Sequence, residues 1–353
     1  MNELISRRVS EPQSKTPVLV SVLVCTRNRG PNVVPTVRSI LASDFPSLEL
    51  LVLDQSDDGT TRDALAPVLA RDPRLAYHHL GLPGKARALN RGCAMTRGQY
   101  VLLTDDDCEV LPNWIGSMVE EFERNPDVDC VFGRVDAGSF DPAEGYVPVC
   151  PISEPRTIRR LDELLTMPGW GNFGMGANMS IRAGALAHLH GWDECIGPGA
   201  KFGSGDDHDL SVRLLRAGSA IRFSSTPRVI HYGLRRWDNA GRDYRRIWFG
   251  LGGVFAKHLR CGSFYWGGIR VPVNQVRDCT TKLLHGERPY GVSYVASWLR
   301  GFGSGLIHPL DRELSRFVPQ TEDATKYAGR VADVVLRHAD RNSPDVPPPP
   351  AAG

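Results

Sequence analysis

The sequence predicts an α/β protein with a mostly parallel central sheet flanked by helices. Short apolar, β-branched runs alternate with helical stretches along the first third of the chain, and each of these runs ends in a polar segment. The chain has 353 residues, of which 41% are hydrophobic and 23% are charged. This composition is ordinary for a globular protein with a sizeable core and excludes a disordered or collagen-like chain.

The predicted elements follow one another at the spacing of strand–helix repeats. Four apolar runs have the length and composition of buried strands, at residues 18–25, 48–54, 75–79 and 100–104. Helical stretches lie between them at 32–42, 61–70 and 85–96, and a further helix is expected at 206–217. Further extended segments are expected at 129–135, 176–181, 221–224 and 229–232. Ligands bind outside the carboxyl ends of such strands, which directs attention to residues 26–30, 54–60 and 105–107.

Charge is distributed unevenly along the chain. Residues 1–212 hold 20 Lys and Arg against 29 Asp and Glu, whereas residues 213–300 hold 16 against 4. This pattern indicates a cation site in the first part and an anionic partner near the second, with charge balance across one fold as the alternative.

Nothing in the sequence marks it for secretion or for a membrane span. The opening segment has no apolar core of a signal peptide, and no apolar run approaches the roughly 18–20 residues that cross a bilayer. The eight cysteines are scattered without a C-x-x-C pair, which disfavours a metal cluster and a disulfide framework. We therefore expect a cytoplasmic protein.

Two acidic clusters could carry chemistry. Asp105, Asp106 and Asp107 directly follow a predicted strand, and oxygen ligands of this kind suit Mg²⁺ or Mn²⁺. An exposed acidic turn is the alternative. The second cluster is the run GSGDDHD at 203–209, which opens a predicted helix. Helix capping explains one or two of its acids, and a ligand site would explain the rest.

Basic side chains and the absence of other motifs add to this picture. Lys85 and Arg87 lie at the start of a predicted helix, which is typical of a phosphate site, although a solvated basic face fits equally well. The chain has no G-x-G-x-x-G after the first strand, no G-x-x-x-x-G-K-[ST] and no G-x-S-x-G. Dinucleotide-binding enzymes, P-loop NTPases and α/β-hydrolases are therefore disfavoured.

Taken in order, these segments resemble the family 2 glycosyltransferases, which have the GT-A fold. The matching pieces are VSVLVCTRNR, LLVLDQSDDGT, ARALNRG, YVLLTDDDC, the long run from Gly191 to Gly218, and the trailing His231. The resemblance implies a GT-A domain at 17–234, with a nucleotide-binding half at 17–108 and an acceptor and catalytic half at 109–234. The rest of the chain is expected to be a flexible N-terminus at 1–16, a basic, mainly helical extension at 235–340 and a disordered proline-rich tail at 341–353.

The resemblance also implies an activity, which is inverting transfer of a sugar from a nucleotide diphosphate donor, with a UDP-sugar expected. Asp207 would be the general base that takes the proton of an acceptor hydroxyl. Asp105 and Asp107 would form the D-x-D pair that holds Mn²⁺ or Mg²⁺, with His231 as a further metal ligand. The donor would be bound by residues in or beside these motifs: Thr26, Arg27, Asp54, Asp57, Lys85, Arg87, Asp105, Asp106 and Asp206.

The stretch after His231 departs from the pattern of processive family members. They usually carry Q-x-x-R-W, whereas this chain has Gly233-Leu-Arg-Arg-Trp237 without the Gln. We therefore expect a non-processive enzyme, in which Arg235 and Arg236 close over the donor diphosphate or an anionic acceptor. An alternative is that the basic block forms an amphipathic surface for anionic lipid at the inner face of the membrane, through Arg242, Arg245, Arg246, Lys257, Arg260, Trp248 and Phe255.

Other functions stay open. The acceptor is unknown, with an anionic or lipid-linked molecule as one expectation, and no nucleic-acid partner is expected because no recognised module accompanies the basic block. A sugar-phosphate nucleotidyltransferase would share the fold and the acidic metal site, but such an enzyme needs a glycine-rich loop after the first strand. In this chain residues 25–30, which follow that strand, hold a single glycine. A non-catalytic nucleotide-sugar binding protein is the second alternative.

Overall fold

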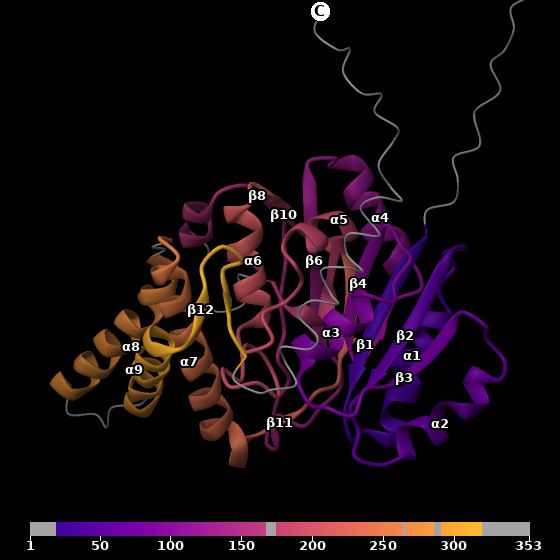
Figure 1. The fold of residues 1–353 in the computed structure, drawn as a ribbon. Helices are drawn as coiled ribbons and strands as arrows, with labels where there is room; N and C mark the ends of the chain where they lie inside the picture. Colours follow the sequence, from indigo (N-terminus) through magenta and orange to yellow (C-terminus); the bar gives the residue numbers. More distant parts are fainter. Residues whose placement is uncertain (1–18, 167–173, 264–265, 286–290, 320–353) are drawn as a thin grey trace, which may run out of the picture.

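The computed structural model describes residues 19–166, 174–263, 266–285 and 291–319, and it has the predicted α/β architecture (Figure 1). A curled, mostly parallel sheet lies at the centre, with helices on its faces and a helical C-terminal part beside it. The N-terminus at 1–16 and the proline-rich tail at 341–353, which the sequence analysis expects to be loose, lie outside the described residues.

The central sheet has nine strands in the order β3-β2-β1-β4-β9-β6-β10-β5, with β8 paired to β10. Its strands are β1 (Val20–Thr26), β2 (Leu48–Asp54), β3 (Leu75–His79), β4 (Tyr100–Asp105), β5 (Cys108–Val110), β6 (Val128–Ala137), β8 (Arg156–Ile158), β9 (Met179–Arg182) and β10 (Ala220–His231). The first four strands pair in parallel, whereas β9 is antiparallel to both of its neighbours. Two short ladders complete the strands: β7 (Gly145–Tyr146) with β11 (Arg235–Arg236), and β12 (Leu310–Asp311) with β13 (Arg316–Phe317).

The helices that connect and flank the sheet are α1 (Val34–Leu41), α2 (Thr60–Leu69), α3 (Lys85–Cys93), α4 (Trp114–Arg124), α5 (Ala183–His188) and α6 (Asp206–Arg216), with short 3₁₀ turns η1 (Gly30–Val33), η2 (Leu161–Thr166) and η4 (Gly176–Asn178). The C-terminal part contains α7 (Trp237–Arg260), α8 (Trp266–Leu284) and α9 (Val292–Ile307), which lie on the side of the molecule away from β3 (Figure 1). None of the helices in the described ranges is long and apolar enough to cross a membrane.

The sheet is covered on both faces, which explains the uninterrupted apolar runs in the sequence. Every residue of β2 is buried, and β1 is buried except for the half-exposed Cys25. One strand differs from the expectation. The segments 221–224 and 229–232 belong mostly to one strand, β10, which keeps its pairing with β6 through a register shift between Ser224 and Arg228.

Candidate functional site

The carboxyl ends of the first parallel strands bring the predicted motifs together. In the register of the sheet, Thr26 pairs with Asp54 and Cys25 pairs with Asp105. The loops that follow these strands therefore meet at one edge, as the rule for open α/β sheets predicts. A cavity of about 270 Å³ lies there, lined by Cys25, Thr26, Arg27, Arg29, Gln55, Pro83, Gly84, Lys85, Asp105, Asp106, Asp107, Pro198, Gly199, His231 and Arg235.

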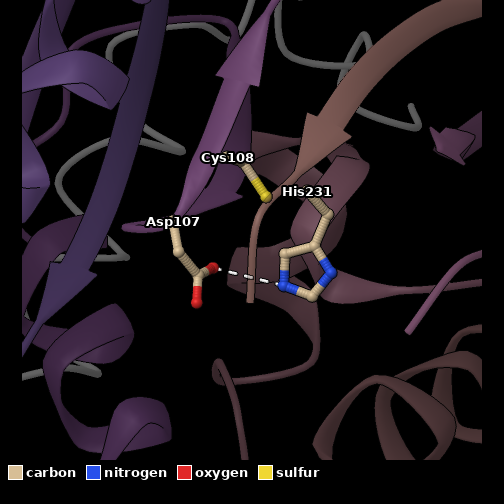
Figure 2. A group of neighbouring side chains, drawn as sticks. All are labelled: Asp107, Cys108 and His231. Atoms are coloured by element: carbon tan, nitrogen blue, oxygen red, sulfur yellow. Dashed lines mark ion pairs between the residues drawn. The ribbon is translucent and has the colours of Figure 1, made fainter. Parts of the chain in front are cut away.

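Antiparallel pairing of β5 with β10 places His231 beside Asp107, although 123 residues separate them in the sequence. His231 lies opposite Cys108 in the ladder, and the backbone N–H of Tyr232 donates to the carbonyl oxygen of Asp107 at 2.8 Å. His231 Nε2 then lies 3.2 Å from Asp107 Oδ1 (Figure 2). The other ring nitrogen, Nδ1, is 2.8 Å from the carbonyl oxygen of Pro148. Since a carbonyl only accepts, Nδ1 carries a proton, and the ring presents Nε2 to the carboxylate.

This pair fits a bound cation. A neutral imidazole with its proton on Nδ1 has a lone pair on Nε2, and that lone pair would face a carboxylate oxygen at 3.2 Å. Two such acceptors repel unless a proton or a metal ion lies between them. Without an ion the protein relieves the repulsion by protonation: burial opposes it, but the hydrogen bond and the charge of Asp107 raise the pKa of His231 above its ordinary value.

The donor atoms near this pair define which ion fits. Asp107, Cys108 and His231 each offer an atom, and the three atoms lie within 4.8 Å of one another (Figure 2). Burial raises the pKa of the Cys108 thiol well above its ordinary value, so this sulfur stays protonated and is a poor ligand. A carboxylate and an imidazole remain, and this donor set suits a divalent ion such as Mn²⁺.

Arg29 is a site residue that the sequence analysis missed. Its guanidinium lies 2.8 Å from Asp107 Oδ2 and 3.3 Å from Asp106 Oδ1, so it bridges two acids of the triplet. Burial opposes ionisation of Asp107, but His231, Arg29 and Arg235 together lower its pKa to about 2. Asp107 is therefore ionised at neutral pH. The only signal in the sequence was the second arginine of the run CTRNR, and a charge in a loop does not reveal its partner.

Lys85 connects the two acidic clusters. It is the first residue of α3, and its ammonium is bound to Asp105 Oδ1. The backbone N–H of Gly176 donates to Asp207 Oδ2 at 3.2 Å, and a Cβ on Gly176 would lie 3.8 Å from Lys85 Nζ. The acids near 105 and those at 206–207 therefore face the same ammonium group. The sugar transfer expected from the sequence requires such a convergence of the two acidic clusters.

The acidic pair at the start of α6 has an unusual electrostatic environment. Burial, together with the charge of Asp207, raises the pKa of Asp206 to about 7. Burial also raises the pKa of Asp207, although N–H groups of His208 and Gly176 stabilise its ionised form. A carboxylate with a raised pKa is a better proton acceptor than an ordinary one, which suits a general base.

The loop before α6 closes against the start of α3. The N–H of Lys85 donates to the carbonyl oxygen of Pro198 at 2.9 Å. Gly199 has φ +81°, and a Cβ there would lie 2.9 Å from the amide nitrogen of Gly84. Glycine is required at this point because the two backbones are in contact. The contact forms part of the cavity wall, since both segments line the cavity.

Several predicted donor contacts lie at the rim of the cavity or behind it. Asp54 is fully buried: Oδ1 accepts from the Ser56 N–H at 2.8 Å, and Oδ2 accepts from the Tyr77 hydroxyl at 2.7 Å. It therefore lies beneath the cavity lining, and its predicted contact with the base stays a prediction. Arg27 lines the mouth and pairs with the exposed Asp57 at 3.3 Å.

The remaining cations divide between the cavity and other partners. Arg87 does not line the cavity and pairs with Glu194 at 3.4 Å. Arg235 lines the cavity, whereas the adjacent Arg236 pairs with Glu144 at 3.1 Å. The structure thus separates two arginines that the sequence analysis treats as equivalent.

The structure contradicts the alternative that the basic block forms an amphipathic surface, because the apolar side chains of that surface are buried. Trp248 and Phe255 are buried in a cluster with α9, and Lys257 is completely buried. The Lys257 ammonium lies between Asp193 and Asp209 rather than on a surface. These residues therefore cannot contact a lipid headgroup.

Comparisons with known proteins agree with this fold. The family model described as "Glycosyl transferase family 2" matches residues 21–188 of this chain. The chain is 24% identical over 225 residues to a glucosyl-dolichyl phosphate glucuronosyltransferase of Haloferax volcanii, covering 60% of this chain and 68% of that protein. It is 26% identical over 128 residues to glycosyltransferase GlyG of Streptococcus pneumoniae, covering 36% of this chain and 42% of that one.

A solved structure shares the fold over nearly the whole chain. The mannosyltransferase PcManGT of Pyrobaculum calidifontis, in complex with GDP-Man and Mn²⁺, superposes with a TM-score of 0.53 at 17% identity. The match covers 94% of this chain and 90% of that one. With the matched strands and the D-x-D segment now placed in one structure, residues 21–188 are a family 2 glycosyltransferase domain, in a chain that has the GT-A fold.

Proposed function

We propose that this glycosyltransferase uses a divalent metal ion to transfer a sugar from a nucleoside diphosphate sugar to an acceptor nucleophile, with inversion at the anomeric carbon. The observation that carries the proposal is the meeting of the D-x-D carboxylates, His231 and Lys85 at one cavity, with the acidic pair close enough to Lys85 and Asp105 to feel their charges. Such a site would bind a cation beside the phosphate and would hold a proton acceptor on the sugar side of the bond that breaks.

The donor is proposed to lie with its diphosphate toward Asp107 and its base toward the mouth formed by Arg27 and Asp57. Asp107 and His231 would hold the metal ion, with Asp105, two residues before Asp107, as a further ligand. When bound, Mn²⁺ or Mg²⁺ neutralises charge that develops on the leaving diphosphate. Arg235 and Lys85 carry positive charge into the same cavity, so they would stabilise that charge further.

Asp207 is proposed as the general base. An acceptor hydroxyl is a poor nucleophile at neutral pH, and a positioned carboxylate that takes its proton typically contributes about 10²–10⁴-fold to the rate. Asp207 is held by the N–H groups of Gly176 and His208 at 3.2 and 2.8 Å, which fixes the direction of its carboxylate. Attack from the side of this base, opposite the diphosphate, inverts the anomeric centre.

The identities of donor and acceptor are finer proposals. A UDP-sugar is the expected donor, and a GDP-sugar is the competing one because the Pyrobaculum mannosyltransferase was solved with GDP-Man. The name of the Haloferax relative includes a lipid-linked sugar phosphate, which supports an anionic or lipid-linked acceptor. Transfer is proposed to be non-processive because the stretch at 233–237 lacks the glutamine of Q-x-x-R-W.

A panel of nucleotide sugars tests the proposal. Each would be incubated with the purified chain and Mn²⁺ or Mg²⁺, and the released nucleotide would be identified. Release of a nucleoside diphosphate is expected, whereas release of pyrophosphate from a nucleoside triphosphate and a sugar phosphate would show a nucleotidyltransferase. Tight binding of a nucleotide sugar without turnover, even with acceptors supplied, would show a binding protein instead.

Two variants separate binding from chemistry. Asp207→Asn keeps the shape of the side chain but removes the base, so turnover should fall by about 10²–10⁴-fold while nucleotide binding is retained. Asp107→Ala should abolish the gain in nucleotide affinity that Mn²⁺ gives. Asp63→Asn, at an exposed carboxylate on α2, is the matched control and should change neither quantity. Full transfer activity in Asp207→Asn would refute the assignment of the base.

A further inference from the structure

Exposed apolar side chains are concentrated on the two last helices. Among the described residues, fifteen large hydrophobic side chains are exposed, and eight of them lie on α8 and α9. The members are Val273, Val276, Leu283, Leu284, Val292, Leu299, Leu306 and Ile307. Leu284 and Ile307 are 81% and 84% exposed. Single exposed apolar residues are normal on a protein surface, but a concentration of this kind indicates an interaction site.

On α9 the exposed apolar residues form one stripe along the whole helix. Val292, Leu299 and Leu306 are separated by seven residues each, so they lie on the same face. Ala296 and Gly303, which are also exposed, lie between them on that face. No charged residue interrupts the stripe.

The opposite face of α9 packs against the rest of the protein. Tyr294 and Trp298 are buried against α7, and a Cβ on Gly301 would lie only 1.9 Å from the carbonyl oxygen of Phe249. The helix is therefore apolar on both faces while only one of them is covered. A surface helix of a globular protein normally has a polar outer face, so the outer face of α9 requires a second apolar environment.

The exposed face of α8 has the same character. Val273, Val276 and Leu283 follow a spacing of three and seven residues, which places them on one side of the helix. Arg277 is four residues after Val273 and borders this side, while Arg300 borders the stripe on α9. Together the two helices hold four Lys and Arg and a single acid, Asp278, which pairs with Lys282 at 3.4 Å.

We propose that the outer faces of α8 and α9 form a docking surface that inserts into the headgroup region of an anionic lipid bilayer. An apolar stripe with cationic borders is the pattern of helices that lie in a membrane interface, where arginines reach the lipid phosphates. A second copy of the chain fits less well, because a symmetric contact would bring Arg277 and Arg300 of both copies together without acidic partners. This surface differs from the one that the sequence analysis considers, and it does not depend on the identity of the donor.

Flotation of the full chain with lipid vesicles tests the proposal. The wild-type protein should float with vesicles of phosphatidylcholine and phosphatidylglycerol, but weakly with phosphatidylcholine alone. Raising NaCl from about 0.1 M to about 1 M should weaken binding, since the Debye length falls from about 10 Å to about 3 Å. Arg277→Gln and Arg300→Gln should each lower the partition coefficient about fivefold.

The apolar stripe is tested with acidic substitutions. The double variant Leu299→Glu/Ile307→Glu should lower the partition coefficient at least about tenfold. The matched control is Met95→Glu/Phe140→Glu, two exposed apolar side chains outside α8 and α9, each 37% exposed, which should bind like wild type. If the α9 variant has a lower melting temperature, Val276→Glu/Leu284→Glu on α8 replaces it.

Three results would overturn the proposal. The first is absence of wild-type binding to anionic vesicles, and the second is equal binding by the α8 or α9 double variant. The third is a wild-type dimer in light scattering that the α9 variant dissociates without lipid, since the surface would then be a subunit contact. Hydrolysis of the nucleotide sugar in solution is measured separately, and its outcome does not bear on the docking surface.

Discussion

Replacing Lys257 by Met tests how the C-terminal helices support the site. The Lys257 ammonium is completely buried, 2.8 Å from Asp193 Oδ2 and 2.5 Å from Asp209 Oδ1. Asp209 is also 2.8 Å from His258 Nε2 and 3.9 Å from Arg213. Met fills nearly the same volume as Lys but removes the charge. The substitution therefore leaves two buried carboxylates, of which Asp209 keeps Arg213 as its cationic partner and Asp193 loses its own.

The expected loss of stability follows from this arrangement. Breaking a buried ion pair by removing one partner costs about 3–5 kcal/mol. Asp209 keeps two cationic or imidazole neighbours, but Asp193 keeps only N–H donors, from Phe317 at 2.7 Å and Cys195 at 3.0 Å. We therefore expect the free energy of unfolding to fall by about 4 kcal/mol, measured by urea unfolding.

The pH dependence of this loss has a definite sign. Burial opposes ionisation of Asp209, but Lys257 and His258 hold its pKa far below the ordinary value, so its stabilising effect is present above an unfolded pKa of about 3.8. Without Lys257 that pKa rises above the unfolded value. The variant then regains stability relative to wild type as the pH falls, because protonation removes the buried charge.

Two further variants complete the test. Lys257→Met/Asp193→Asn removes the isolated charge and should recover at least about 2 kcal/mol of the loss. Arg124→Met removes an exposed i,i+4 pair with Glu120 on α4 and should cost less than about 0.5 kcal/mol. A loss below about 1 kcal/mol for Lys257→Met, or a loss that is the same at pH 5 and pH 8, would refute this reasoning.

Three further predictions concern the cavity. Arg235→Ala should raise the donor KM or lower kcat by about tenfold in steady-state kinetics, whereas Arg236→Ala should change either by less than twofold because its guanidinium pairs with a carboxylate outside the cavity. Gly233→Ala would place a Cβ 2.5 Å from Nε2 of His231, a proposed metal ligand, so calorimetry should show weaker Mn²⁺ binding, and wild-type affinity would contradict the proposed site. The raised pKa of Asp207 predicts that kcat/KM falls on the acid side at a higher pH than an ordinary carboxylate would give, and that Asp206→Asn shifts this fall to lower pH by removing the like charge; an unshifted profile would contradict the coupling.

The strands and the position of the site could be predicted because both follow from local patterns. Uninterrupted apolar runs identify the parallel strands, and the carboxyl-edge rule then places residues 105–107 at a ligand site. The continuity of β10 could not be predicted. Pro227 lies within it and normally ends a strand, but here it lies in the irregular stretch between Ser224 and Arg228, where no ladder hydrogen bond is needed.

The sequence also could not predict which groups the charged residues pair with. Arg29 and Lys257 look alike in the sequence, as cations in polar or amphipathic segments. One lies in the cavity on Asp107, and the other is buried on acids 48 and 64 residues earlier in the chain. Helical periodicity shows that one face of α7 is apolar, but it does not show whether a lysine beside that face points to water or to a buried carboxylate.

The buried ion network predicts a role in catalysis for the C-terminal helices. Asp207 and Asp209 lie two positions apart on the first turn of α6, so they point to opposite sides of the helix. Asp207 accepts from the N–H of Gly176, whereas Asp209 is bound by Lys257 on α7. The expected division at residues 234 and 235 therefore separates the proposed base, Asp207, from Lys257, which binds the next acid on the same helix. If this support matters for chemistry, Lys257→Met should lower kcat at temperatures where the variant is fully folded while leaving the Kd for the nucleoside diphosphate unchanged.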